Sequence, residues 1–191
     1  MNETANINHS MNKQLFIDKD RLDFLLAKLN AKLKERSLKG VIDLYGGTAM
    51  LLLTRARKAT KDIDATFIPT KEFREIIKEV AEEQEISPDW LNDGVKGYVS
   101  ANPDIIKYKD LSNLEVNQLS PKYLLSMKIL SSRTGTEDIS DIKFLINHIE
   151  IKKKSELLDI FNTYYGRHGN VSALHRALSI IDEISDEMKL E

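Results

Sequence analysis

The stretch DLYGGTAMLLLTRARKATKDIDATF, residues 43–67, decides the fold that we expect for this chain. Residues 41–45 form a short apolar run that starts with β-branched side chains and stops at Gly46-Gly47, which is typical of a buried strand. Strong helix formers follow at residues 48–53, and after a basic loop the residues of DIDATFI, 62–68, alternate as in a second strand. The segment therefore predicts a strand, a glycine turn, a short buried helix and a neighbouring strand.

The glycine turn and the two acids of this stretch suggest phosphate and metal chemistry. A strand that enters a helix through Gly46-Gly47 presents free backbone N–H groups, and glycine lets a phosphate approach them closely. Thr48 adds a hydroxyl that could donate to a phosphate oxygen. Asp62 and Asp64 have the period of a strand, so both carboxylates project from one face and favour a divalent cation between them. Together they predict metal-assisted phosphoryl or nucleotidyl transfer, although each element alone is also compatible with a plain turn or a solvated strand face.

The rest of the chain predicts an α/β (α+β) fold with a small mixed sheet flanked by helices. Leucines recur at helical spacing in residues 18–37, and residues 71–85 form an amphipathic helix. DIIKYK and LEVNQL predict two further strands, and everything from Ser120 onward predicts helix. We expect a flexible N-terminus at 1–17, an α/β domain at 18–118 and a C-terminal helical bundle at 119–191.

Composition excludes several function classes. The chain has 191 residues with a formal net charge of -2, so binding of a polyanion would need a local basic patch. The absence of cysteine excludes disulfides, thiol catalysis and cysteine-type zinc sites. No apolar run approaches the ~20 residues of a membrane span, and the polar N-terminus does not resemble a signal peptide. We therefore expect a cytoplasmic protein without membrane contact.

A lysine within an apolar helix is the second notable feature. Residues 121–131 are apolar on nearly every side, and Lys128 lies among them, so its ammonium group needs a partner, a phosphate ligand or a path to water. Asp138 and Asp141 follow at the start of the next helix, where acids commonly complement the helix dipole. The alternative is that one of them orients Lys128 or Arg133, or holds the base or sugar of a nucleotide.

Both segments resemble a known superfamily. LYGGTAMLLLTRARKATKDIDATF is similar to the first motif of the nucleotidyltransferase-fold superfamily, and within it to the toxin-like branch that includes the abortive-infection AbiEii toxins and the MenA/MenT-like tRNA-modifying toxins. That branch tends to have GGTAL, then R-x-T-x-D-I-D. The matching residues are Gly46, Gly47, Thr48, Ala49, Thr60, Asp62, Ile63 and Asp64. The arginine position is occupied by Lys58, with Arg57 beside it, and LSPKYLLSMKILSSRTGTEDISDIKFLI resembles the second half of the branch.

The resemblance implies a nucleotidyltransferase fold at 18–118 and a set of site residues. It implies catalytic roles for Asp62, Asp64, Lys128 and Asp141. It implies nucleotide or phosphate binding by Gly46, Gly47, Thr48, Lys58, Thr60, Arg133 and Asp138. It implies metal binding by Asp62 and Asp64, with Glu115 as a third acid and Asp104 as the other candidate.

The resemblance also implies a reaction and its partners. An NTP would be the substrate, one or two Mg²⁺ ions the cofactor, and RNA, such as a tRNA 3′ end, the acceptor. A cognate antitoxin protein would be a partner, in a toxin–antitoxin or phage-defence setting. Two alternatives stay open: a catalytically silent module that binds a nucleotide or a protein, and a small-molecule nucleotidyltransferase of the antibiotic-modifying type.

Overall fold

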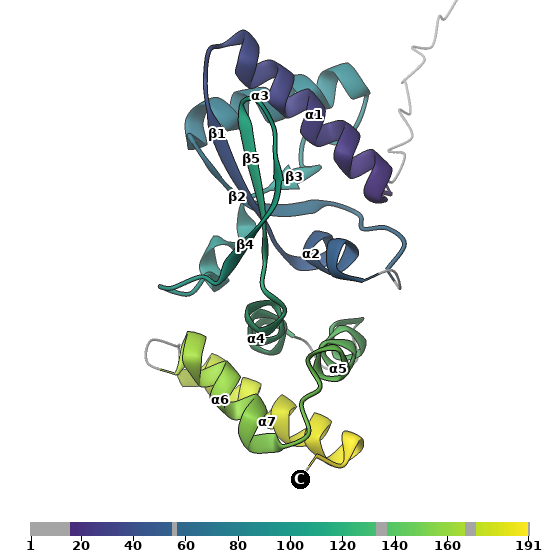
Figure 1. Cartoon of the computed structure of the whole chain (residues 1–191), viewed down its shortest axis with the longest axis vertical. Helices are drawn as coiled ribbons and strands as arrows, with labels where there is room; N and C mark the ends of the chain where they lie inside the picture. Colours follow the sequence, from purple (N-terminus) through teal and green to yellow (C-terminus); the bar gives the residue numbers. More distant parts are fainter. Residues whose placement is uncertain (1–15, 55–56, 133–136, 167–170, 191) are drawn as a thin grey trace, which may run out of the picture.

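The computed structural model describes residues 16–54, 57–132, 137–166 and 171–190 (Figure 1). Its helices and strands are, in chain order, α1 (Lys19–Glu35), β1 (Gly40–Leu44), α2 (Gly46–Leu53), β2 (Ile63–Ile68), α3 (Thr70–Gln84), β3 (Leu91–Asn92), the 3-10 helix η1 (Gly94–Tyr98), β4 (Ile105–Asp110), β5 (Leu114–Leu119), α4 (Pro121–Ser131), α5 (Glu137–Ile149), α6 (Lys154–Tyr165) and α7 (Val171–Met188). Arg133 and the first fifteen residues lie outside the described residues, so the expectations for them stay predictions.

The strands form one five-stranded mixed sheet in the order β3-β2-β1-β5-β4. β1 pairs with β2 antiparallel and with β5 parallel, while β3 pairs with β2 parallel and β4 with β5 antiparallel. The hydrogen bond from the N–H of Tyr45 to the carbonyl of Asp64 extends the β1–β2 pairing to the point where α2 begins. The expected mixed α/β fold is thereby confirmed, with the glycine turn and the acids at neighbouring strand ends.

One core lies between the sheet and the helices α1 and α3, which lie together in the upper half of Figure 1. The leucines of α1 that recur at helical spacing are fully buried, and β1 contributes Ile42 and Leu44. Asp62 and Asp64 flank Ile63, which is also fully buried in this core. Burying Ile63 leaves Asp64 on the opposite face of β2, because side chains alternate along a strand.

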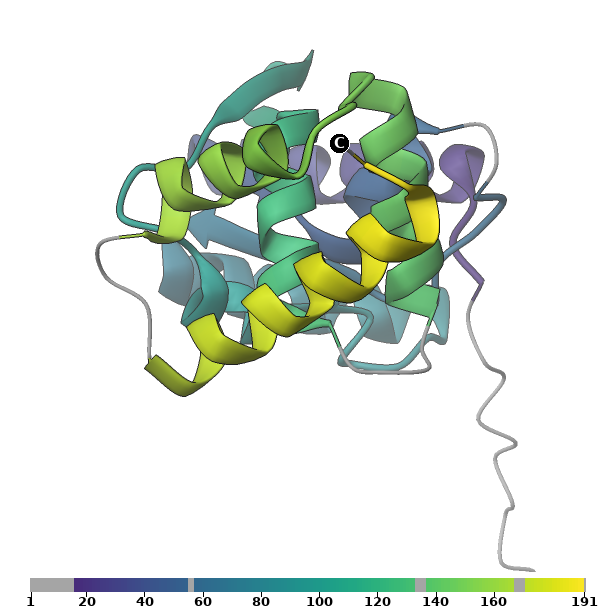
Figure 2. The same ribbon diagram turned by 90° about the horizontal axis from the view of Figure 1, so that it is seen from below.

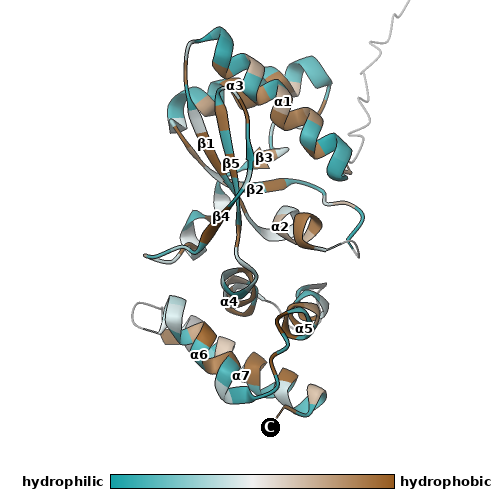
Figure 3. Cartoon of the chain, in the orientation of Figure 1, coloured by the Kyte–Doolittle hydropathy of each residue, from teal (hydrophilic) through white to brown (hydrophobic). Residues whose placement is uncertain are grey.

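A second core lies among the C-terminal helices, and it includes residues of the α/β part. α4 is buried between the sheet unit and α5–α7, and α7 crosses beneath it in Figure 2. Apolar residues of α4 to α7 are interspersed with hydrophilic ones in Figure 3. Tyr45, Ala49 and Met50 belong to this second core, so α2 packs directly on the helical region. Among the described helices, none is long and apolar enough to cross a membrane.

Candidate functional site

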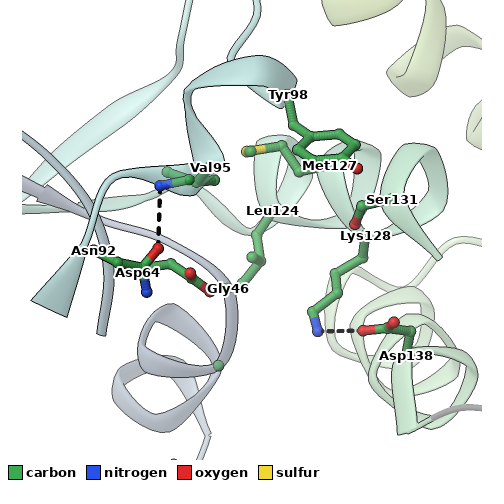
Figure 4. A pocket seen from close by; sticks show the side chains of 12 residues that line it. Gly46, Asp64, Asn92, Val95, Tyr98, Leu124, Met127, Lys128, Ser131 and Asp138 are labelled. Atoms are coloured by element: carbon green, nitrogen blue, oxygen red, sulfur yellow. Dashed lines mark hydrogen bonds and ion pairs between the residues drawn. The ribbon is translucent and has the colours of Figure 1, made fainter. Parts of the chain in front are cut away.

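A cavity of about 270 Å³ lies where the start of α2, η1 and α4 meet (Figure 4). It is lined by Gly46, Gly47, Asp64, Asn92, Gly94, Val95, Tyr98, Leu124, Met127, Lys128, Ser131 and Asp138. Five of these residues were expected at the site from the sequence: the two glycines, Asp64, Lys128 and Asp138. The structure therefore brings residues of the first and second sequence segments to one cavity.

Gly46 and Asp64 are in direct contact at the base of this cavity. Gly46 has φ +53°, which favours glycine, and a Cβ atom there would lie 2.5 Å from Oδ2 of Asp64. A Cβ atom on Gly47 would lie 2.6 Å from Oγ1 of Thr60. A larger residue at either position would therefore have to displace a polar side chain of β2 or of the preceding loop, and at Gly46 it would also be strained by the positive φ.

The start of α2 offers hydrogen-bond donors to the cavity. The first intrahelical bond runs from the N–H of Ala49 to the carbonyl of Tyr45 at 3.0 Å, and Tyr45 gives no side-chain cap. The N–H groups of Gly46, Gly47 and Thr48 therefore have no acceptor within the helix. With the partial positive charge of a helix N-terminus, they suit an anion.

Two threonines support the acids rather than line the cavity. The hydroxyl of Thr48 is fully buried and donates to the backbone carbonyl of Asp62 at 3.4 Å. The hydroxyl of Thr60 donates to the same carbonyl at 3.2 Å. Both threonines thus hold the residue that begins the Asp-Ile-Asp strand, and direct phosphate binding by either stays a prediction.

The two acids influence each other. Burial and, next, the charge of Asp62 raise the pKa of Asp64, while the side chain of Asn92 and the charge of Lys128 oppose this shift. Asn92 is the β3 residue paired with Asp64, and its Oδ1 accepts a hydrogen bond from the N–H of Gly94 at 3.1 Å. Sequence reasoning missed Asn92, because a two-residue strand has no periodic pattern to detect.

Lys128 finds protein partners in the folded chain. It is only 8% exposed, and its Nζ lies 2.7 Å from Oδ1 of Asp138 and 2.8 Å from Oδ2 of Asp141. The same Oδ2 lies 2.9 Å from Nη1 of Arg57. The ion-pair network of Arg57, Asp141, Lys128 and Asp138 joins the loop after α2 to α4 and α5. Lys128 is therefore paired with both acids, where the sequence had suggested one of them as a possible partner, and any nucleotide phosphate would share Lys128 with them.

The loop after α2 brings Arg57, not Lys58, to the glycines. The Cζ atom of Arg57 lies 3.5 Å from the position of a Cβ atom on Gly47. Lys58 is exposed, and it lines a second cavity together with Arg57, Asp18 and Lys19. Arg57 is thus the cation of this loop that lies against the glycines, and phosphate binding by Lys58 stays a prediction.

Comparison with known proteins agrees with this geometry at a coarse level. A family model described as "Nucleotidyltransferase of unknown function (DUF6036)" matches residues 20–168. The chain belongs to this family. Neither curated proteins nor solved structures gave a significant match. The matched range contains the whole cavity and the ion-pair network, so the expected superfamily is supported, while the toxin-like branch stays a prediction.

In this family member, the two candidates for a third acid are engaged elsewhere. Glu115 lies 3.1 Å from Nζ of Lys107 and accepts a hydrogen bond from Asn117, and Lys107 is the main cause of its lowered pKa. Asp104 accepts hydrogen bonds from Ser120 at 2.6 Å and from Tyr164 at 3.0 Å. Within the described ranges, no group of three or more carboxylate or imidazole side chains is placed to hold a metal.

The Asp62–Asp64 pair nevertheless fits a magnesium ion that a nucleotide helps to bind. Mg²⁺ is commonly held by one or two carboxylates, with substrate phosphates and water completing its shell. Asp62 is exposed and Asp64 half-buried, and burial, followed by the charge of Asp62, raises the pKa of Asp64; a cation between the two carboxylates would relieve the repulsion that Asp62 contributes. The donor set is therefore suitable for a metal bound together with phosphate, and not for a resident metal held by protein groups alone.

Proposed function

We propose that this member of the nucleotidyltransferase family transfers an NMP group from an NTP to an acceptor hydroxyl. The observation that carries the proposal is the placement of the Asp64 carboxylate directly against Gly46, at a helix N-terminus, with buried Lys128 lining the same cavity. Nucleotidyl transfer requires anion donors, carboxylates for a metal and a cation, and this cavity is lined by the two glycines, Asp64 and Lys128, with Asp62 exposed two residues before Asp64.

The residues have separable roles in this proposal. The N–H groups at the start of α2 bind phosphate oxygens, and Arg57 and Lys128 offset the negative charge of the leaving pyrophosphate. Asp62 and Asp64 would hold Mg²⁺, which when bound would supply charge neutralisation at the α-phosphate and lower the pKa of the acceptor hydroxyl. The acceptor oxygen bonds to the α-phosphorus, its proton passes to solvent, and the bond from that phosphorus to the pyrophosphate oxygen breaks. Asp138 and Asp141 fix the direction of Lys128.

RNA is the acceptor that we propose, with a tRNA 3′ end as the first example to test. The sequence resemblance supports this choice, and so do the exposed cations Lys58 and Lys61 in the loop that precedes the acids. A toxin role restrained by a cognate antitoxin is the corresponding biological setting. It is proposed here on the resemblance alone.

A catalytically silent nucleotide-binding module is the second candidate. It is favoured by one observation: Glu115 and Asp104, the expected third acids, have their own partners away from the Asp62–Asp64 pair. Asn92, a neutral amide, is the β3 residue paired with Asp64. In this alternative the fold binds an NTP without transferring it.

Transfer of label from two positions of the NTP distinguishes these candidates. The protein is incubated with Mg²⁺, total RNA and each NTP, labelled at either the α- or the γ-phosphate. The proposal expects RNA to gain the α-label and not the γ-label. Gain of the γ-label would indicate a phosphoryl-transfer enzyme instead, and NTP binding without any transfer would support the silent module.

Matched variants make the result specific. Asp62→Asn and Asp64→Asn keep the size of each side chain and remove its charge, so transfer should fall by at least about 10²-fold, as for removal of other transition-state charge stabilisers. Asp159→Asn, at an exposed position on α6, is the control and should transfer normally. If Asp62→Asn and Asp64→Asn transferred label as well as Asp159→Asn and the wild type do, the assignment of the two acids would be overturned.

A further inference from the structure

The cavity has two chemically different ends. Its polar end contains the backbone of Gly46 and Gly47 and the side chain of Lys128, to which the proposed function assigns the phosphates. Its other wall is apolar and is formed by Val95, Tyr98, Leu124 and Met127. A triphosphate is charged and has no apolar group to pack against this wall, so the wall is suited to a different part of the nucleotide.

Tyr98 is the notable residue of the apolar wall. Its side chain lies beside Met127 in Figure 4, at the end of the cavity away from Gly46. Tyr98 is 42% exposed, whereas Tyr45, Tyr123 and Tyr165 are buried. An aromatic ring that is open to solvent on a cavity wall is a surface on which a planar group can stack.

The backbone at and just after Tyr98 is held by two hydrogen bonds to tyrosines of the helical region. The hydroxyl of Tyr165 donates to the carbonyl of Tyr98 at 2.6 Å, and the N–H of Ser100 donates to the hydroxyl of Tyr123 at 2.9 Å. Because Tyr123 and Tyr165 belong to the buried core of the helical region, the C-terminal helices fix the position of η1.

The other end of η1 is anchored by charge. Asp93 lies 2.6 Å from Nζ of Lys96 and 2.7 Å from Nη2 of Arg74, and these hydrogen bonds lower its pKa to about 2. These contacts hold η1 in place before a ligand binds, so a ligand that stacks on Tyr98 would lose little affinity to the entropic cost of ordering this segment.

We propose that the wall formed by Val95, Tyr98, Leu124 and Met127 binds the nucleobase of the NTP, with the base stacked on Tyr98. This inference rests on the proposed function. The wall would recognise the base through stacking on its flat face and not mainly through hydrogen bonds to its edge. Of the neutral polar side chains lining the described cavity, Asn92 already bonds to Gly94, and Ser131 remains for the base edge. Stacking is tolerant of base identity, so all four NTPs should use the same wall.

Binding measurements on the full chain test this directly. Calorimetry is carried out in Mg²⁺ with the α,β-methylene analogues of the four NTPs, which cannot release an NMP group, and with inorganic triphosphate. Tyr98→Ala should weaken binding of every analogue by about five- to a hundredfold, the range expected for loss of one base–aromatic stack. Binding of inorganic triphosphate should not change, because that ligand has no base.

Two further variants control the experiment. Tyr98→Phe keeps the ring and should bind as the wild type does. Phe24→Ala removes a comparably exposed aromatic ring, 41% exposed, from α1, and it should also bind normally. Nucleotide binding that Tyr98→Ala leaves unchanged would overturn this inference alone. Failure of the wild type to bind either the analogues or inorganic triphosphate would overturn the proposed function together with it.

Discussion

The carboxylate of Asp64 lies so close to Gly46 that a single added carbon would collide with it: the Cβ position of Gly46 is 2.5 Å from Oδ2 of Asp64. The strand that carries the acid and the turn that carries the anion donors are therefore fitted to each other. This relationship explains why the glycine turn and the Asp-x-Asp strand occur together in the sequence. Together with the cavity above them, it also predicts how the protein responds to small changes.

Gly46→Ala should damage both the fold and the site. The substitution imposes a left-handed conformation on alanine, which costs about 1–2 kcal/mol, and it pushes the carboxylate of Asp64 aside. We expect urea unfolding to show a loss of at least that size, and transfer activity to be lost. Gly97→Ala is the control, since a Cβ atom there meets nothing within 4 Å. If Gly46→Ala and Gly97→Ala changed stability and transfer to the same extent, the close fit between Gly46 and the Asp64 carboxylate would not be important.

Asp64→Asn should stabilise the protein at neutral pH while it abolishes transfer. The pKa of Asp64 is higher in the folded chain than its ordinary value of 3.8, mainly through burial. The folded state therefore holds this proton more tightly, and the ionised form destabilises the fold as pH rises above 3.8.

The measurement for Asp64→Asn is the free energy of unfolding from pH 3 to pH 8, without added metal. The gain over wild type should be largest at neutral pH and should disappear as pH falls through 3.8. Addition of Mg²⁺ and inorganic triphosphate should then stabilise the wild type more than the variant. A variant that is less stable than wild type at pH 7 would contradict the account of this carboxylate.

Lys128→Met should be destabilising because it removes the buried cation that Asp138 and Asp141 share, although Asp141 keeps its ion pair with Arg57. We expect a loss of about 2–4 kcal/mol, somewhat below the cost of breaking a fully buried pair. Adding Asp138→Asn and Asp141→Asn should recover part of this stability, since the charges that Lys128 neutralised are then gone. Activity should not return. Recovery of transfer in the triple variant would show that Lys128 has only a structural role.

Arg57→Ala should raise the KM for NTP, and Lys58→Ala should change it little. Arg57 lies against Gly47 and is bonded to Asp141, whereas Lys58 is exposed and lines only the second cavity. Loss of one charged hydrogen bond to phosphate predicts about a ten- to hundredfold decrease in kcat/KM. Steady-state kinetics on both variants provides the check, and the reverse order of effects would restore Lys58 as the phosphate-binding cation.

Much of the fold follows from local sequence patterns. The strand expected at residues 41–45 is β1, Gly40–Leu44, and the helix expected around Lys128 is α4, Pro121–Ser131. These predictions succeeded because apolar periodicity, glycine and proline mark the ends of such elements. β3 and η1 could not be predicted in the same way. They are only two and five residues long, and their positions depend on contacts with β2 and the C-terminal helices.

The site was predictable to the extent that its residues are close in sequence. Gly46, Gly47 and Asp64 belong to one strand–helix–strand unit, so their proximity follows from β1–β2 pairing. The choice between Arg57 and Lys58 depends on the path of a loop, and the apolar wall depends on the docking of η1 against Tyr165. Spacing in the sequence contains neither kind of information, because both are set by long-range packing.

A crystal structure of the chain grown with Mn²⁺ and an α,β-methylene NTP would show whether the metal, the triphosphate and the base occupy the positions that we propose. Anomalous scattering locates Mn²⁺, which binds the same oxygen ligands as Mg²⁺. We expect the ion at Asp62 and Asp64, the triphosphate on the N–H groups that begin α2, and the base against Tyr98. A nucleotide bound elsewhere, or triphosphate in this cavity with the ion away from both acids, would contradict the proposal.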